Sequence, residues 1–441
     1  LVTGIATAYM DSVPMIAITC NVTLPLLGKD SFQEIDIAGI TTPITKHNFI
    51  VKDVENLADT IRRAFNIARK GRPGPVLVDI PKDVTAAKCE YEPQSPEFPA
   101  RVSHTIKDED IERALRRIRK AKKPFIFVGG GAVISEASDE LRKFVDLVDA
   151  PVCDTLMGKG AFDGTHDLYT GMLGMHGKQV ANQNINKTDC LLAIGCRFSD
   201  RTTGKLEEFI PDAKVIHIDI DPAEIGKNVE VDLPIVGDAK NILSSLNKSL
   251  KGYRTSDDVN KWTDMIKQRK TDLLPRVTYD DVPLKPQTVI KEISEVLTAD
   301  SILTTDVGQN QMWAAHFYDT QKPRKFLSSG GLGTMGFGFP SAIGAKVACP
   351  EDPVVSLSGD GGFLMVCQEL ATVYDYDLPV IAIVLENRTL GMVYQWQSLL
   401  YNNRHSQTVF KDSPDFVKLA ESFNINAERI TKPGETKEAL S

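Results

Sequence analysis

The chain has 441 residues, 42% of them hydrophobic and 25% charged, and its formal net charge is −8. This composition is typical of a globular protein of roughly two to four domains. The acidic balance argues against nucleic-acid binding, which needs clustered Lys and Arg. Seven scattered cysteines show neither a CxxC pair nor zinc-ligand spacing, and no apolar run reaches the about 18 residues of a membrane helix. We therefore predict a cytoplasmic protein with free cysteines.

The first block of the chain, residues 1–90, has the pattern of an α/β domain. Strand, helix and strand are predicted at 14–19, 53–70 and 74–81. The block starts without Met and without a basic leader, and the last residues stop without a closing element. We expect a chain that is truncated at both ends, so that its first and last domains are incomplete.

A Pro-rich linker is predicted at 91–105. The second block, residues 106–252, alternates short apolar runs with helical patterns, which indicates parallel βαβ winding. Its strands are predicted at 123–131, 150–156, 189–198, 213–221 and 234–238. A polar, helix-prone linker at 253–282 leads to the third block, residues 283–441. The expected fold class is α/β, with three doubly wound parallel-sheet domains.

The third block contains the stretch VVSLSGDGGF, in which an apolar strand stops at a glycine that is followed by Asp360. A glycine-rich turn with a capping Asp is by itself common in α/β proteins. Here a helix at 362–377 follows, and a second apolar strand, 378–386, ends just before Asn387. The two strands of a βαβ unit are parallel, so their carboxyl ends open at the same edge of the sheet. We therefore expect Asp360 and Asn387 to converge.

Asp360 and Asn387 would present a carboxylate oxygen and an amide oxygen at one point. Hard oxygen ligands in small number suit Mg²⁺, which completes its shell with water and phosphates. Gly361 and Gly362 let main-chain N–H groups approach phosphate oxygens. The sequence therefore predicts a metal-bridged diphosphate at the carboxyl edge of the sheet, where open α/β sheets bind ligands.

Longer motifs surround this pair. They are GKDSFQEIDI (28–37), RPGPVLVDIPKDV (72–84), TTDVGQNQMWAAHFY (304–318), SSGGLGTMGFGFPSAIGAKVA (328–348) and LGMVYQWQSLLY (390–401). Over essentially the whole chain, they resemble the catalytic subunit of the acetolactate synthase family of thiamine-diphosphate enzymes. The resemblance implies a transferase that decarboxylates pyruvate and adds the two-carbon unit to pyruvate or 2-ketobutyrate, in valine, leucine and isoleucine biosynthesis. It also implies thiamine diphosphate, Mg²⁺ and FAD as cofactors.

By this resemblance, Asp360, Asn387 and the main-chain carbonyl of Thr389 would hold Mg²⁺. Met335 would bend thiamine diphosphate so that its amino group reaches the reactive carbon, and Trp396 would shape the pocket for the second ketoacid. Core packing is the alternative role for both side chains. The further contacts to thiamine diphosphate would come from Gln33, Gln309, Asn310, Gly333, Thr334, Gly361, Gly362, Leu390, Gly391 and Met392.

The middle block resembles the FAD-binding domain of the family. Its GGGAVIS stretch is not the GxGxxG fingerprint, because Ile134 stands where the third glycine would be, so an ordinary NAD site is disfavoured. The resemblance implies FAD contacts from Arg72 of the first block and from Gly130, Thr155, Leu156, Leu173, Gly174, Met175, His176, Gly195, Arg197, Ser199, Asp219, Ile220 and Asp238.

The chain departs from the family pattern at several positions. Asn310 replaces a His, and its amide N–H₂ group would take over the contact with the diphosphate. Glu386 replaces the first of two Asn, and we expect its carboxylate to point away from the metal. Ser199 replaces an Asp that contacts the flavin.

In the family, a Glu that activates thiamine diphosphate lies before the segment that matches Leu1, and a C-terminal arm helps to close the site. Neither is found in this chain, so we assign no catalytic acid or base and predict that residues 1–441 alone are inactive.

Other classes of protein stay open from the sequence. Another thiamine-diphosphate enzyme, such as a pyruvate oxidase or a different ketoacid carboligase, would share the Asp360 motif. An NAD(P)-linked Rossmann dehydrogenase is disfavoured by the missing fingerprint, and a non-catalytic binding or assembly fragment is compatible with truncation. The resemblance implies an active site shared between two subunits, and hence a homodimer or homotetramer, to which a small regulatory subunit could bind. No nucleic acid or membrane partner is expected.

Overall fold

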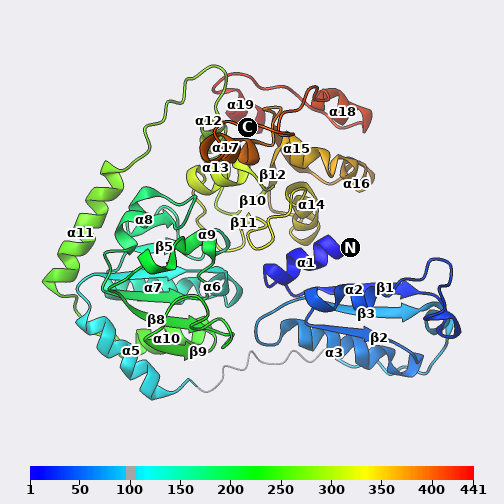
Figure 1. The fold of residues 1–441 in the computed structure, drawn as a ribbon, viewed down its shortest axis with the longest axis horizontal. Helices are drawn as coiled ribbons and strands as arrows, with labels where there is room; N and C mark the ends of the chain where they lie inside the picture. Colours follow the sequence, from blue (N-terminus) through cyan, green and yellow to red (C-terminus); the bar gives the residue numbers. More distant parts are fainter. Residues whose placement is uncertain (96–105) are drawn as a thin grey trace. The chain divides into compact units, whose positions relative to one another are not determined.

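The computed structural model of the protein describes residues 1–95 and 106–441. The strands of this part form three parallel sheets, with the orders β1-β3-β2, β6-β5-β4-β7-β8-β9 and β11-β10-β12-β13 (Figure 1). The expected fold class is therefore confirmed. The chain divides into two compact units, Leu1–His104 with Gly330–Gly333 and Thr105–Ser329 with Thr334–Ser441. The predicted linker at 91–105 lies outside the described residues from position 96 onward.

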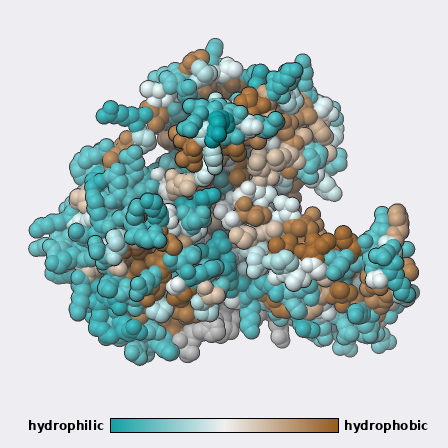
Figure 2. Space-filling model, in the orientation of Figure 1, coloured by the Kyte–Doolittle hydropathy of each residue, from teal (hydrophilic) through white to brown (hydrophobic). Residues whose placement is uncertain are grey.

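The first unit is built on a small sheet whose middle strand, β3, is fully buried. Its continuous apolar run is typical of a central parallel strand. The strands are β1 (Ile16–Asn21), β2 (His47–Ile50) and β3 (Val76–Pro81), and the helices are α1 (Val2–Met10), α2 (Ile37–Thr41), α3 (Leu57–Arg69) and α4 (Lys82–Ala86). Strand β2 was not predicted, because HNFI has no apolar run. Apolar side chains gather on the surface around α1 (Figure 2).

The central sheet of the second unit has helices on both faces, as a doubly wound sheet requires. Its strands are β4 (Pro124–Val128), β5 (Val152–Asp154), β6 (Tyr169–Met172), β7 (Cys190–Ile194), β8 (Lys214–Asp219) and β9 (Leu233–Val236). One core contains residues of α5 (Asp108–Lys120), α7 (Ser138–Val148) and α10 (Ala239–Ser249), and the other contains residues of α8 (Gln179–Ile185) and α11 (Asp257–Asp272). The short helices are α6 (Gly130–Ile134) and α9 (Asp200–Thr203).

Helix α11 lies in the segment 253–282, which we expected to be a linker. Its Trp262 and Ile266 are buried in the central-domain core, and the Trp262 indole N–H donates to the carbonyl of Pro124 at 3.0 Å. The apolar residues Val259, Trp262 and Ile266 recur at helical spacing. The many charged residues between them concealed this buried face in the sequence.

The C-terminal sheet consists of β10 (Ile302–Thr305), β11 (Phe326–Leu327), β12 (Val354–Gly359) and β13 (Val380–Leu385). One core contains residues of α12 (Pro286–Val296), α13 (Gln309–Phe317) and α19 (Glu435–Leu440). Helices α14 (Gly338–Ala348), α16 (Leu370–Asp375) and α18 (Phe416–Ser422) contribute to a second core, on the other face of the C-terminal sheet. The two remaining α-helices of this domain are α15 (Asp360–Leu364) and α17 (Gly391–Leu400).

The helix predicted at 362–377 is interrupted. Val366 leaves the helical region, with φ −139° and ψ 14°. Its side chain lies against Gly336, where a Cβ would stand only 2.9 Å from Val366 Cγ1, so tertiary packing overrides the local helical pattern. In the part of the chain that the structure describes, no helix is both long enough and apolar enough to cross a membrane.

Candidate active site

The site is centred where strands β12 and β13 end. The two strands pair in parallel, with Gly359 opposite Leu385, so Asp360 and the loop after β13 meet at the carboxyl edge, as the βαβ pattern predicts. Asp360 is 1% exposed. Its Oδ2 accepts hydrogen bonds from the N–H groups of Asn387 at 3.1 Å and Arg388 at 2.6 Å, and its Oδ1 accepts one from Gly361 at 2.8 Å.

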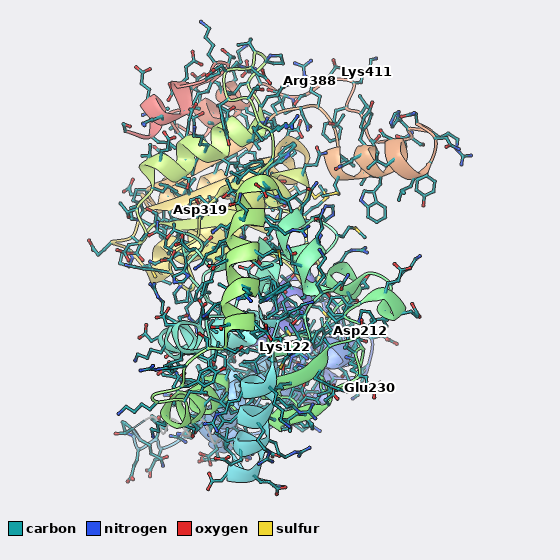
Figure 3. The ribbon with its side chains drawn as sticks, turned by 90° about the vertical axis from the view of Figure 1, so that its left-hand side faces the viewer. Lys122, Asp212, Glu230, Asp319, Arg388 and Lys411 are labelled. Carbon is teal, nitrogen blue, oxygen red and sulfur yellow. The ribbon has the colours of Figure 1, made fainter. Side chains whose placement is uncertain are left out.

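The loop after β13 is held in a strained conformation. Arg388 has φ +58°, which is uncommon for a residue with a Cβ and costs about 1–3 kcal/mol. This backbone directs the Arg388 N–H to Asp360, while its carbonyl accepts from the N–H of Phe410 at 2.9 Å. The Arg388 side chain itself extends into solvent (Figure 3). The strain is therefore local to the residue that connects the two predicted metal ligands, Asn387 and Thr389.

The oxygen atoms at this loop fit a small hard cation. Asp360 offers a carboxylate, Asn387 an amide oxygen and Thr389 a main-chain carbonyl. Within residues 1–95 and 106–441, the Oδ1 atom of Asp360 accepts one hydrogen bond, from the N–H of Gly361, which leaves it a lone pair for a metal. Among the described residues, no group of three or more His, Cys, Asp and Glu side chains could hold a metal. A metal here would therefore need additional oxygens from water or phosphate, which is the habit of Mg²⁺.

Glu386, which stands beside this loop, has its charge compensated elsewhere. Its carboxylate oxygens lie 3.3 Å from Arg388 Nε and 3.4 Å from a terminal nitrogen of Arg429. Arg429 in turn pairs with Asp415 at 3.1 Å. These partly exposed pairs each contribute little to stability, but together they turn the Glu386 carboxylate toward two guanidinium groups.

The glycines of the turn are required by close packing. A Cβ on Gly361 would stand 2.8 Å from Leu390 Cδ2, and one on Gly362 would stand 2.6 Å from Asp306 Oδ2. A Cβ on Gly391 would collide with the Gln309 side chain. The three segments 306–309, 361–362 and 390–391 therefore approach one another as closely as their main chains allow.

The side-chain amide of Asn310 is hydrogen-bonded to main-chain carbonyls. Asn310 is 4% exposed, and its Nδ2 donates to the carbonyls of Asp306 at 2.9 Å and Leu357 at 3.1 Å. Both N–H bonds are thus used on main-chain acceptors. In this structure the amide ties α13 to β12, and its contact with a diphosphate in place of a His stays a prediction.

The loop that contains Met335 lies on the same edge. Gly333 and Gly336 flank it with φ +71° and +84°, values that glycine adopts without strain. The Thr334 N–H donates to Ser329 Oγ at 3.1 Å, and the Gly336 N–H donates to both carboxylate oxygens of Asp306, at 2.9 and 3.1 Å. Met335 is half-buried, so its side chain is not sequestered as a core filler would be.

Helix α17 carries Trp396, and an arginine of the central domain faces it. The Arg201 guanidinium carbon lies 5.7 Å from the centre of the Trp396 ring, within the range of a cation–π contact. Arg201 belongs to α9, and its guanidinium forms an ion pair with the exposed carboxylate of Asp200 at 3.1 Å. An aromatic surface and a cation are thus brought together on the side of α17 that the central domain faces.

Comparison with known proteins agrees with this geometry. The family described as "Thiamine pyrophosphate enzyme, central domain" matches residues 111–246, and "Thiamine pyrophosphate enzyme, C-terminal TPP binding domain" matches residues 306–441. The whole chain is 53% identical to a probable acetolactate synthase large subunit of Methanocaldococcus jannaschii, over 76% of that protein. The identity is 46% with the acetolactate synthase large subunit of Haemophilus influenzae and 43% with the isozyme 3 large subunit of Escherichia coli, each over 78% of the relative. The chain belongs to the acetolactate synthase large-subunit family.

The central domain of this family member has the topology of a dinucleotide-binding sheet. Counted within the domain, its strand order is 3-2-1-4-5-6, so the direction of winding reverses between β4 and β7, where such sheets bind ligands. The residues expected to contact FAD follow the carboxyl ends of the strands or lie in the loops near them: Gly130, Thr155, Leu156, Leu173, Gly174, Met175, His176, Gly195, Arg197, Ser199, Asp219, Ile220 and Asp238.

Several of these residues also have structural partners. The Gly131 N–H donates to the Gly195 carbonyl at 3.0 Å, which brings the two loops at the reversal point together. Thr155 and Asp238 cap the helical turns that follow them. Ser199 Oγ lies 3.3 Å from Thr202 Oγ1. The pKa of His176 is lowered by burial and then by Arg201, so its imidazole is neutral at neutral pH and Arg201 stays the local cation.

The first unit contains the remaining predicted contacts. Gln33 is exposed, with φ +63°, and Arg72 Nε donates to Ser12 Oγ at 2.8 Å. Lys46 donates its ammonium to the carbonyls of Ile67 and Lys70 at 2.6 Å and of Arg72 at 2.8 Å. It therefore closes the C-terminus of α3, where a cation is favourable.

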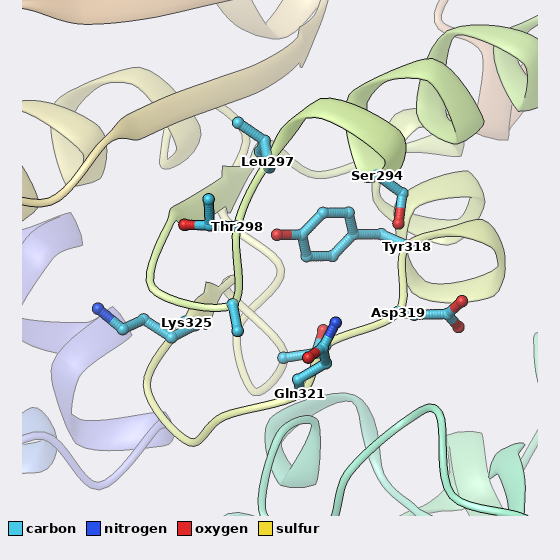
Figure 4. Close-up of a pocket in the computed structure, with 9 residues that line it drawn as sticks. Ser294, Leu297, Thr298, Tyr318, Asp319, Gln321 and Lys325 are labelled. Atoms are coloured by element: carbon cyan, nitrogen blue, oxygen red, sulfur yellow. The ribbon is translucent and has the colours of Figure 1, made fainter.

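A separate small pocket lies at the opposite edge of the C-terminal sheet (Figure 4). Residues 297–299 and Lys325, which line it, precede strands β10 and β11. Burial raises the pKa of Tyr318 in this pocket to about 12. The pocket is thus on the amino side of the strands and does not belong to the site around Asp360.

Two residues of the site were missed from the sequence. Asp306 stands at the carboxyl end of β10, and the edge argument that found Asp360 would also have found it. Arg201 follows β7 at the matching edge of the central sheet, but nothing in the sequence places it beside Trp396.

Proposed function

We propose that the protein is an acetolactate synthase, which transfers the two-carbon unit of pyruvate to a second 2-ketoacid with thiamine diphosphate and Mg²⁺. The observation that carries the proposal is the convergence of Asp360, Asn387 and Thr389 at one sheet edge, inside the domain that matches the thiamine pyrophosphate-binding family. Asp360, Asn387 and the carbonyl of Thr389 would hold the metal, and the main chain at Gly361 and Gly362 would face the diphosphate.

The remaining residues fit a reaction that needs orientation more than acid–base groups. Thiamine diphosphate, when bound, supplies the carbon nucleophile that the side chains of this site lack. Met335 would support the cofactor from its half-buried loop. Trp396 would offer an apolar wall to the ketoacid, and Arg201 would bind its carboxylate, since a guanidinium matches a carboxylate with two parallel hydrogen bonds.

The product of pyruvate conversion tests the proposal. With Mg²⁺ and thiamine diphosphate, the protein should form acetolactate from pyruvate, and removal of the metal by EDTA should abolish the reaction until Mg²⁺ is restored. Acetyl phosphate and peroxide as products would show a pyruvate oxidase instead. The assay should be made with the full-length protein.

We further propose that the central domain binds FAD. The strand order, which reverses between β4 and β7, supports this proposal. The expected FAD contacts also lie in the loops at the carboxyl ends of the central-sheet strands. Flavin-free protein should take up FAD, seen as a saturable change in flavin fluorescence, and NAD should not compete with it. Binding of NAD in place of FAD would contradict the proposal and favour a dehydrogenase-like site.

We also propose that the protein assembles with further subunits. Relatives of this chain are named large subunits, so a small regulatory subunit is a candidate partner. Apolar side chains are exposed on the edge strands of two sheets, with Ile18 of β1 57% exposed and Ile381 of β13 44% exposed. Exposed apolar residues on strands favour association with further protein, and we propose a homodimer or homotetramer.

A further inference from the structure

One buried carboxylate of the C-terminal domain is stabilised by main-chain groups rather than by a cation. Asp306 is 0% exposed. Its oxygens accept from the N–H of Val307 at 2.5 Å and from that of Gly336 at 2.9 and 3.1 Å. Burial raises the pKa of Asp306, and only these N–H groups oppose the shift. An ionised side chain in such a place lowers stability, so its contacts point to a role other than holding the fold together.

Two glycines contact this side chain, and a third packs against the main chain of Asp306. Gly336 donates its N–H to the carboxylate. A Cβ on Gly338 would stand 2.6 Å from the Asp306 nitrogen, and one on Gly362 would stand 2.6 Å from Oδ2 and 2.7 Å from Cγ. The carboxylate therefore fills the space between the loop of Met335 and the turn that follows Asp360. No longer side chain fits there, and a shorter one would leave the Gly336 N–H without its acceptor.

We propose that Asp306 is a positioning residue that fixes the separation between the Met335 loop and the diphosphate turn, so that one cofactor molecule can contact both. This inference rests on the proposed function, because it takes thiamine diphosphate as the molecule that spans the two segments. Asp306 touches neither cofactor nor substrate in this account. It acts through the Gly336 N–H on one side and through Gly362 on the other.

Its negative charge argues against a direct role in attracting the ligand. A carboxylate beside the turn would repel a diphosphate rather than bind it. If the charge mattered chiefly in this way, its removal would strengthen the binding of every diphosphate. If the separation matters, removal should weaken only ligands that reach both segments. Thiamine diphosphate and inorganic diphosphate differ in just this respect, since the second can occupy the turn alone.

The test compares these two ligands on Asp306→Asn. In the full-length protein with Mg²⁺, titration calorimetry should show thiamine diphosphate binding weakened by at least about tenfold, or ~1.4 kcal/mol, because the amide loses an acceptor for the Gly336 or Val307 N–H. Inorganic diphosphate should bind within about twofold of the unsubstituted protein. Asp352→Asn serves as the matched control: Asp352 precedes β12 at the opposite edge and pairs with Lys325 at 2.6 Å, so neither ligand should be affected.

Stability separates positioning from a purely structural role. Because the pKa of Asp306 is raised in the fold, its contribution to stability falls as the pH rises through that pKa. Asp306→Asn removes the buried charge but turns an amide N–H₂ group against a main-chain N–H, so the two effects oppose each other and the unfolding midpoint at neutral pH should change little. Equal weakening of both ligands, tighter binding of both, or no change in either would overturn the proposal.

Two further outcomes are also decisive. If Asp306→Asn does not fold, hydrogen exchange in the cofactor-free unsubstituted protein replaces it: the Gly336 amide should exchange slowly, and fast exchange would overturn the proposal. If the unsubstituted protein binds inorganic diphosphate but not thiamine diphosphate, the proposed function fails and this inference fails with it. If the unsubstituted protein binds thiamine diphosphate and Asp306→Asn binds it equally well, only the inference fails.

Discussion

Asp360→Asn should lower the rate of acetolactate formation at saturating Mg²⁺ and thiamine diphosphate by at least about 100-fold, equivalent to ~2.7 kcal/mol of lost stabilisation. The substitution keeps the shape of the side chain but removes the only carboxylate among the three proposed metal ligands. It also places an amide N–H₂ group against a main-chain N–H, either those of Asn387 and Arg388 or that of Gly361. A donor facing a donor in a buried site costs about 1–3 kcal/mol, so the metal loop would also lose its anchor.

The measurement is the Mg²⁺ dependence of the rate, with Asp377→Asn as the matched control. Asp377 is exposed, precedes β13 at the amino edge of the sheet, and has φ +48°, a conformation that Asn adopts readily. The control should keep the activity and the Mg²⁺ dependence of the unsubstituted protein. An Asp360→Asn variant that bound Mg²⁺ and turned over pyruvate normally would remove Asp360 from the proposed metal site.

The edge where the site lies was predictable from the sequence, and the hydrogen bonds within it were not. A glycine-bounded Asp and an Asn after successive apolar strands sufficed to predict that Asp360 and Asn387 meet, because parallel strands of a βαβ unit share one edge. The left-handed conformation of Arg388 and the use of both Asn310 donors on carbonyls depend on how the loops pack. The hydrogen bonds from Asn310 to Leu357 and from Arg388 to Asp360 join segments that are distant in sequence, so no local pattern reveals them.

The errors in secondary structure have the same origin. The segment that forms α11 was expected to be helix-prone, but its packing in the core was not predicted, because its buried side chains are few and its Trp262 donates to the carbonyl of Pro124, far away along the chain. The predicted helix after Asp360 breaks at Val366 because the Met335 loop packs there. Strand β2 is short and pairs only with β3. In each case a long-range contact outweighs a weak local preference.

Arg201→Gln should raise the KM for pyruvate by at least about tenfold, or ~1.4 kcal/mol, and change kcat less. The guanidinium faces the Trp396 ring at 5.7 Å, and its ion pair with Asp200 is well exposed and contributes little to stability. It is therefore available to a substrate carboxylate, which it can hold with two hydrogen bonds beside an apolar wall. Gln keeps polarity and length but not the charge, so the loss should appear in substrate binding.

Two control variants test whether the effect on the KM is specific to the guanidinium of Arg201. Arg142→Gln removes a guanidinium from the same domain, where Arg142 is half-exposed and lies 4.0 Å from Asp146, and it should leave the KM unchanged. Arg201→Lys keeps the charge without the two-pronged geometry, so its KM should fall between those of Arg201→Gln and the unsubstituted protein. Added salt should raise the KM of the unsubstituted protein more than that of Arg201→Gln, because a partly exposed ion pair is screened.

If Arg201→Gln instead lost thiamine diphosphate affinity at unchanged KM, Arg201 would belong with the cofactor-binding residues, and the carboxylate of the ketoacid would need another partner along α17.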